Sequence, residues 1–186
     1  MSDVSSAFIK AYEKLEGNIV DIMVEEQAKL GYRKESVRLY YPLSSLSHFF
    51  EETDATTERM NALLSGFPEY MSNKYGDVGI TNKGDRFCFT MSELASEYVH
   101  NKREDNKFIQ QLVDLVGRHG TTMQQITELF KNEDESCIID NVDNGEFDIL
   151  IKFSDSKDRY FYCFKDEGCH IIYHRFLPED YYDLGF

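Results

Sequence analysis

The sequence predicts an α+β fold: a helical N-terminal and middle region with a small β-hairpin, packed on a C-terminal antiparallel sheet of three or four strands. Two observations carry this prediction. Apolar residues recur every three or four positions through most of residues 6–132, which is the period of one helix face. From Cys137 onward they recur at every second position, which is the period of a strand.

The chain is long enough for one well-buried core. Its 186 residues fit the usual range of about 100 to 200 residues for a domain. Hydrophobic residues make up 41% and aromatic residues 14%, which provides the apolar area that folding needs. We therefore expect a single α+β domain over residues 1–186, helix-rich to about residue 132, with a hairpin near 78–90 and the sheet at about 136–176.

A long helix and a short strand are expected first. One apolar stripe with helical spacing runs through residues 6–30. It consists of Phe8, Ile9, Tyr12, Leu15, Ile19, Met23 and Leu30. Gly31 fits the left-handed residue that ends many helices. Two sets then alternate: Val37, Leu39 and Tyr41 on one side, and Arg38 and Tyr40 on the other. This alternation predicts a strand or extended segment that Pro42 ends.

Helices and a hairpin follow. Residues 43–74 have the apolar spacing of two helices, separated near residues 53–57, with Pro68 disturbing the second. In residues 79–90, GITNKGDRFCFT, two short runs of β-forming residues flank Asn-Lys-Gly, which is typical of a tight turn, so we expect a hairpin there.

Capping boxes mark two further helices. Thr90 with Glu93, and Thr122 with Gln125, have the spacing in which a threonine side chain opens a helix. The first helix should reach about residue 100, and the second starts after a break that contains two glycines. A strongly apolar helix is expected between them, at residues 108–116.

The C-terminal region predicts the sheet. Residues 147–153 alternate between apolar and mostly polar positions, and the runs RYFYCF and CHIIYHRF flank an Asp-Glu-Gly turn. With a three-residue turn at 166–168, the register places one set of residues on a common face. This set is Tyr160, Tyr162, Phe164, His170, Ile172 and His174.

Two imidazoles opposite two phenols can transfer protons or bind a polar ligand near neutral pH, with His170 or His174 as a general base. The alternative is that these aromatic cross-strand pairs only stabilise the sheet. No nucleophile or oxyanion-hole glycine motif stands at a telling spacing.

Metal and cofactor sites are not expected. Cys163, Cys169, His170 and His174 are residue types that bind zinc. On a strand, however, the two histidines lie about 13 Å apart, too far for one ion to bridge. We predict no metal and no cofactor.

The formal charge of −14 and the pI near 4.7 oppose binding to nucleic acid. The helices around GRHGTT have the look of a helix-turn-helix followed by a β wing, but the acidic run NEDE comes directly after them. A nucleic-acid binder is therefore the disfavoured third interpretation.

The N-terminus lacks a signal-peptide core, and no apolar run reaches the length of a membrane span, so no membrane association is expected. Four sparse cysteines fit reduced thiols. We expect a cytoplasmic protein.

Residues 29–42, KLGYRKESVRLYYP, form a basic island. Its cations are Lys29, Arg33, Lys34 and Arg38, and its single acid is Glu35. It binds an anionic ligand through Arg33, Lys34 and Arg38 with Tyr32, Tyr40 and Tyr41, or it is a partner surface, or it ties the N-terminal helix to the acidic sheet through ion pairs and buried tyrosine rings. All three interpretations stay open.

Three strings in the chain, EEQAKLGYRKESVRLYYPLSSLSHFF, NGEFDILIKF and GCHIIYHRFLPEDYYD, are similar to a bacterial family known only as a domain of unknown function, found largely in Gram-positive gut anaerobes. The resemblance spans nearly the whole chain. It implies a bacterial cytoplasmic protein of one domain and assigns no catalytic residue.

The leading hypothesis is a non-catalytic binding or interaction module for an unknown protein or small anionic ligand. Its candidate contact residues are Arg33, Lys34, Arg38, Tyr40, Tyr41, Tyr160, Tyr162, His170 and His174. The alternative is a small hydrolase or lyase-type enzyme that uses His170 or His174 as a general base.

Overall fold

A computed structural model describes residues 2–102, 107–142, 144–154 and 159–185. The chain forms two compact units, Met1–Lys107 and Phe108–Phe186, which are described separately below. The α+β class is confirmed, with a helical N-terminal and middle region, a small sheet, and a C-terminal antiparallel sheet of four strands. The single domain stays a prediction.

Within the described residues, no helix combines the length and the apolar character that crossing a membrane requires.

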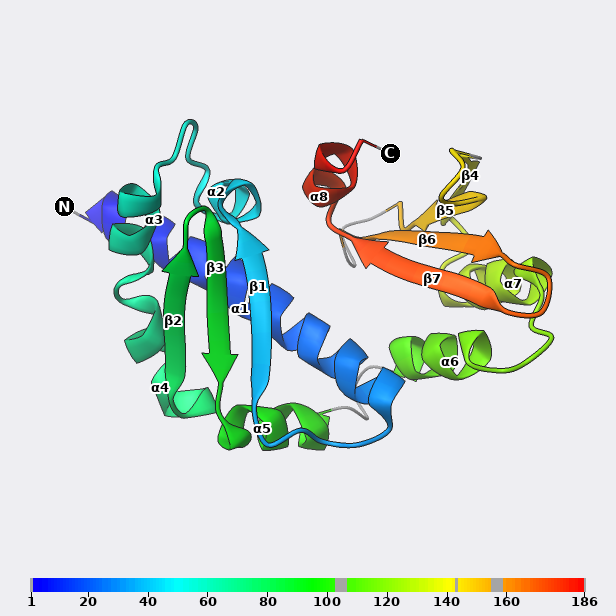
Figure 1. The fold of residues 1–186 in the computed structure, drawn as a ribbon, viewed down its shortest axis with the longest axis horizontal. Coiled ribbons are helices and arrows are strands. Elements are labelled where there is room, and N and C mark those ends of the chain that lie inside the picture. Colours follow the sequence, from blue (N-terminus) through cyan, green and yellow to red (C-terminus); the bar gives the residue numbers. More distant parts are fainter. Residues whose placement is uncertain (1, 103–106, 143, 155–158, 186) are drawn as a thin grey trace. The chain divides into compact units, whose positions relative to one another are not determined.

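The first unit combines helices with a three-stranded sheet (Figure 1). Its elements are α1 (Ser2–Leu30), β1 (Val37–Pro42), α2 (Leu43–Phe50), α3 (Thr57–Leu64), α4 (Phe67–Tyr75), β2 (Val78–Lys83), β3 (Arg86–Met91) and α5 (Glu93–Lys102). Helix α1 passes behind the strands in Figure 1, and its Leu15, Ile19 and Met23 are fully buried. The expected N-terminal helix is confirmed, and Gly31, at φ 72°, ends it.

Residues 43–75, all of them described, form three helices where two were expected. The second expected helix is divided between Leu64 and Phe67, and Pro68 stands in the first turn of α4. A proline in the first turn is compatible with a helix, because the missing N–H has no intrahelical acceptor there. Pro68 therefore begins a helix and does not disturb one.

Strands β1, β3 and β2 form sheet A, in that order and antiparallel throughout. The hairpin prediction is confirmed, with Gly84 and Asp85 as its two-residue turn and Gly84 at φ 61°. Along β1 and β3, buried residues alternate with exposed or half-buried ones, so one face of the sheet belongs to the core.

The capping box expected at Thr90 is wrong. Thr90 lies within β3, opposite Arg38, and the helix begins at Glu93. The hydroxyl of Ser92, which precedes this helix, donates to the backbone oxygen of Tyr75 at 2.8 Å. Pairing with Arg38 holds Thr90 in an extended conformation. The spacing of Thr90 and Glu93 in the sequence does not reveal this pairing.

The second unit packs helices on sheet B, whose strand order is β4-β5-β6-β7. Its elements are α6 (Lys107–Val116), α7 (Met123–Glu133), β4 (Ile138–Asn141), β5 (Ile149–Lys152), β6 (Phe161–Asp166), β7 (Ile171–Phe176) and α8 (Pro178–Asp183). The capping box of Thr122 and Gln125 is confirmed. Residues 143 and 155–158 of the expected sheet region lie outside the described residues.

The register predicted for β6 and β7 is wrong. Asp166 pairs with Ile171, so the connection has four residues, 167–170, where three were expected. One extra residue moves every side chain of the returning strand to the other face. His174 therefore lies opposite Cys163, and Tyr162 lies opposite Arg175.

Candidate functional site

The face of sheet A that points away from the core forms a regular grid, called here the outer face. Cross-strand pairing arranges its nine residues in three rows: Arg38, Thr90 and Gly79; then Tyr40, Cys88 and Thr81; then Pro42, Arg86 and Lys83. With about 6.6 Å between rows and about 4.8 Å between strands, the grid measures about 13 Å by about 10 Å.

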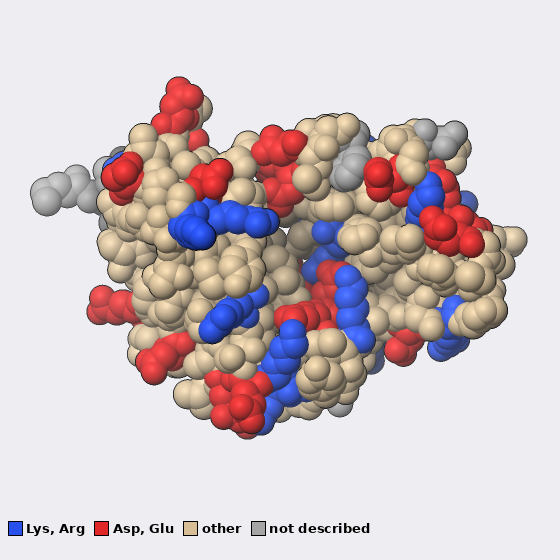
Figure 2. All heavy atoms as spheres, in the orientation of Figure 1, with Lys and Arg blue, Asp and Glu red and all other residues tan. Residues whose placement is uncertain are grey.

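Three of the nine residues are cationic and none is acidic. Arg38, Lys83 and Arg86 are exposed, and none of them has an ion pair with any residue that the structure describes. Figure 2 shows basic side chains over these strands, while acidic side chains gather around them. The outer face is thus a local cationic surface on a chain of charge −14.

The other cations of the basic island are neutralised within the first unit. Arg33 contacts Glu93 at 3.1 Å and Glu97 at 3.7 Å, both on α5. Lys34 pairs with Glu26 of α1, and Lys29 pairs with Glu25 at 2.6 Å. The four cations of the basic island are close together in the sequence, but only Arg38 belongs to the outer face.

The tyrosines of the island also separate. Tyr41 is buried, and its hydroxyl donates to Asn18 Oδ1 at 2.5 Å, which fastens β1 to α1. Tyr40 points to the opposite side of the strand and is 60% exposed. Of the two, Tyr40 is available to a ligand and Tyr41 has a structural role.

Sequence reasoning missed Lys83 and Arg86. A signal was present, because Arg86, Cys88 and Thr90 alternate with apolar residues in the predicted hairpin. What the sequence did not show is that β1 pairs with β3, which places Arg38 and Tyr40 in the same grid.

The tyrosines proposed for the C-terminal face lie in the core of the second unit. Tyr162 is fully buried, and its ring lies 5.0 Å from that of Phe130 of α7. Tyr160 is also buried, and the Arg175 guanidinium stands 4.1 Å from the centre of its ring. Both residues pack as core aromatics.

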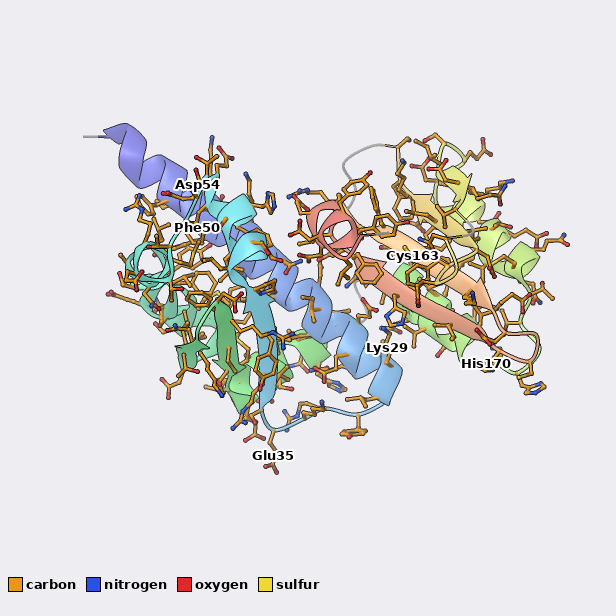
Figure 3. The ribbon with its side chains drawn as sticks, turned by 45° about the horizontal axis from the view of Figure 1, so that its top comes forward. Lys29, Glu35, Phe50, Asp54, Cys163 and His170 are labelled. Carbon is orange, nitrogen blue, oxygen red and sulfur yellow. The ribbon has the colours of Figure 1, made fainter. Side chains whose placement is uncertain are left out.

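The two histidines occupy different places. His174 lies on the sheet face that α8 flanks, with its ring 5.9 Å from those of Phe147 and Phe176. His170 lies at the end of the β6–β7 hairpin, away from Cys163 in Figure 3, with Nδ1 3.2 Å from Cys169 Sγ. Across the described ranges, no carboxylate hydrogen-bonds to either ring. The structure does not assemble the predicted Tyr–His face.

A second polar cluster surrounds Glu16 in the first unit. Its carboxylate accepts hydrogen bonds from Tyr70 and Tyr75, both at 2.7 Å, and from Lys74 at 2.5 Å. Burial raises the pKa of Glu16, but these donors outweigh it and lower the pKa below its ordinary value. Burial and the Glu16 carboxylate raise the pKa of Tyr70 to about 12. The cluster fastens α4 to α1 and leaves Glu16 satisfied.

Cysteine chemistry does not add a site. Burial raises the pKa of the Cys163 thiol to about 12. Among the residues with a described position, no group of three His, Cys, Asp or Glu side chains is arranged to hold a metal ion.

A family model, described as "Domain of unknown function, E. rectale Gene description (DUF3877)", matches residues 12–185. The chain belongs to the DUF3877 family. This confirms the resemblance drawn from the three sequence strings. The match includes both units, so the outer face lies within the family domain. No curated protein and no solved structure matches the chain.

Proposed function

We propose that this DUF3877 protein is a non-catalytic interaction module that binds an acidic protein partner through the outer face of sheet A. The observation that carries the proposal is the set of three cations, Arg38, Lys83 and Arg86, on a face without an acid. Among the residues that the structure describes, these three cations lack an acidic partner, although the sequence contains 34 acidic residues. Arg33 and Lys34, by contrast, each form an ion pair with a nearby acid.

The position of two of these cations supports the proposal. Lys83 and Arg86 lie directly opposite each other across the hairpin. Like charges at such a pair destabilise a sheet. A bound carboxylate would relieve this repulsion, so the pair stabilises a complex more than it stabilises the free protein.

The remaining residues of the face suit a protein surface. Tyr40 offers an exposed ring between the rows that hold Arg38 and Arg86, and tyrosine and arginine commonly carry binding energy at protein interfaces. At physiological salt, charges are screened beyond about 8 Å, so a partner on the face senses these cations more than the distant acids. A long nucleic acid would extend past the grid into the acidic surroundings.

We place this module in the cytoplasm. The support is that its four cysteines are free thiols, which is typical of proteins in a reducing compartment.

A charge-reversal experiment tests the proposal. The face variant carries Arg38→Glu, Lys83→Glu and Arg86→Glu. The control variant carries Lys107→Glu, Arg118→Glu and Lys131→Glu, three exposed cations outside the face, and has the same net charge. The probe is fluorescently labelled poly-L-glutamate. A single-stranded oligonucleotide of equal charge represents nucleic acid, and its affinity is compared with that of the probe.

We expect the wild type to bind poly-L-glutamate and the face variant to bind it at least about tenfold more weakly. The control variant should stay within about twofold of wild type, because its changes affect only the overall field. Equal losses in both variants, no binding by wild type, or tighter binding of the oligonucleotide would each overturn the proposal. Circular dichroism of all three proteins verifies that they are folded.

A further inference from the structure

Strand β1 is an edge of sheet A, and its hydrogen-bonding direction can be derived from the register. The N–H of Leu43 donates to the oxygen of Asp85 at 2.7 Å, which continues the β1–β3 pairing by one step. In an antiparallel ladder, hydrogen-bonded pairs alternate with non-bonded ones. Val37, Leu39 and Tyr41 therefore direct their backbone groups to β3, and Arg38 and Tyr40 direct theirs to the free edge.

The backbone groups on this edge are open. In the described part of the chain, the N–H and C=O groups of Arg38 and Tyr40 have no hydrogen-bond partner. Pro42 follows in the same alternating set and has no N–H to donate, so strand pairing on this edge is limited to its start. Unpaired edges are sites where another extended segment can add.

We propose that the acidic partner binds as an extended segment that adds antiparallel to β1, as a fourth strand of sheet A. This inference rests on the proposed function, because it specifies how the partner of the outer face is held. Backbone hydrogen bonds to Arg38 and Tyr40 supply the register. The cationic side chain of Arg38 selects the charge of the segment, and the neutral phenol of Tyr40 can donate a hydrogen bond to a carboxylate of it.

The geometry defines the sequence of such a segment. Its residues opposite Arg38 and Tyr40 share the outer face and stand about 5 Å from these side chains, so they should be acidic. The residues of the segment that alternate with these acidic ones lie on the side of Leu39 and Tyr41, which are both buried hydrophobic residues. β-Branched apolar residues fit there. The expected ligand alternates acidic with apolar residues.

A pair of variants isolates the backbone contribution. Tyr40→Ala and Tyr40→Pro both remove the phenol, but only Tyr40→Pro removes the edge N–H. The native ladder does not use this N–H, and proline is tolerated on edge strands with the nitrogen facing outward. The probe is a labelled octapeptide of alternating Glu and Val. We expect Tyr40→Pro to bind it about fivefold more weakly than Tyr40→Ala does, the effect of one hydrogen bond.

Modified peptides test the same contact on the unaltered protein, which excludes misfolding of a variant. In an antiparallel addition, the peptide residues that share the face of Arg38 and Tyr40 direct their N–H groups to β1. N-methylation of the Glu residues should therefore remove binding. N-methylation of the Val residues should leave it within about threefold of the parent peptide, because those groups point away.

The outcomes separate this inference from the proposed function. If the octapeptide binds and charge reversal of the face weakens it, while the proline and alanine variants bind equally, the strand addition is overturned and the interaction face is retained. The strand addition is also overturned if the Glu-methylated peptide binds as tightly as the parent peptide or the Val-methylated peptide, or more tightly. If the wild type binds neither poly-L-glutamate nor the octapeptide, both proposals are wrong.

Discussion

Lys83 and Arg86 face each other across the β2–β3 hairpin, on the same side of sheet A. They flank a two-residue turn that the sequence indicates clearly, so the hairpin holds its two cations at a fixed register. None of the nine residues of the outer face is acidic, so no carboxylate of this face neutralises them. In the free protein this pair costs stability, and in a complex with a carboxylate it contributes affinity.

Reversal of one charge in this pair should separate stability from binding. Lys83→Glu places a carboxylate opposite Arg86 and should raise the free energy of unfolding by about 0.5–1 kcal/mol. The same change should weaken binding of acidic peptides. Urea denaturation and peptide titration measure the two effects. Lys83→Gln, which removes the repulsion without adding an attraction, should fall between wild type and Lys83→Glu in stability. A Lys83→Glu protein less stable than the Gln variant would show that the two side chains do not interact.

The Glu16 cluster should dominate the polar contribution to stability in the first unit. Glu16→Gln keeps the size of the side chain but removes the charge that accepts from Lys74, Tyr70 and Tyr75. We expect the free energy of unfolding to fall by about 2 kcal/mol, as for charge-assisted hydrogen bonds that are partly buried. Denaturant unfolding measures it. Glu13→Gln, an exposed change on the same helix, is the control and should alter stability by less than about 0.5 kcal/mol.

Acidification should remove the contribution of Glu16 to the free energy of unfolding. Its pKa in the folded protein lies below the ordinary value of 4.5, because the donors around it favour the carboxylate over the opposing effect of burial. A lowered folded pKa means that the stabilisation is complete above about pH 4.5 and is lost as the pH falls through the folded value. The stability difference between wild type and Glu16→Gln should therefore narrow between about pH 6 and about pH 3. A difference that stays constant over this range would contradict the assignment.

The capping box of α7 offers a test in the second unit. The Thr122 side chain accepts from the Gln125 N–H at 3.3 Å, and the Gln125 side chain accepts from the Thr122 N–H at 2.9 Å. Thr122→Ala should lower the free energy of unfolding by about 1 kcal/mol, measured by chemical denaturation. Thr127→Ala removes a hydroxyl within the same helix and should cost less. Equal losses for the two variants would argue that the cap does not stabilise the helix.

The sequence was sufficient for elements that local chemistry specifies. The helix ended by Gly31, the hairpin at Gly84 and the capping box of Thr122 all follow from residues a few positions apart. The same local reasoning was wrong at Thr90, because pairing with Arg38, more than fifty positions earlier, holds this residue in a strand.

The candidate site was less accessible to prediction, because it depends on register. One residue more in the β6–β7 connection separated Tyr162 from His174, since the side-chain period of a strand is two. In the basic island, the spacing of Arg33 gave no indication of Glu93 and Glu97, which are distant in sequence and pair with it in space. Lys83 and Arg86 joined Arg38 only through the pairing of β1 with β3.

Protection of a single thiol tests the interaction face most directly. Cys88 occupies the centre of the outer face, beside Tyr40, and is half-buried, while Cys169 is exposed in the second unit and serves as the internal control. Alkylation of both thiols by iodoacetamide is followed by mass spectrometry in wild-type protein with and without poly-L-glutamate, the probe that is proposed to lie over the outer face. At a poly-L-glutamate concentration ten times its Kd, alkylation of Cys88 should slow by about tenfold, in proportion to the free fraction, while that of Cys169 stays unchanged. Unchanged alkylation of Cys88 at a concentration that saturates poly-L-glutamate binding would place the partner elsewhere and contradict the account.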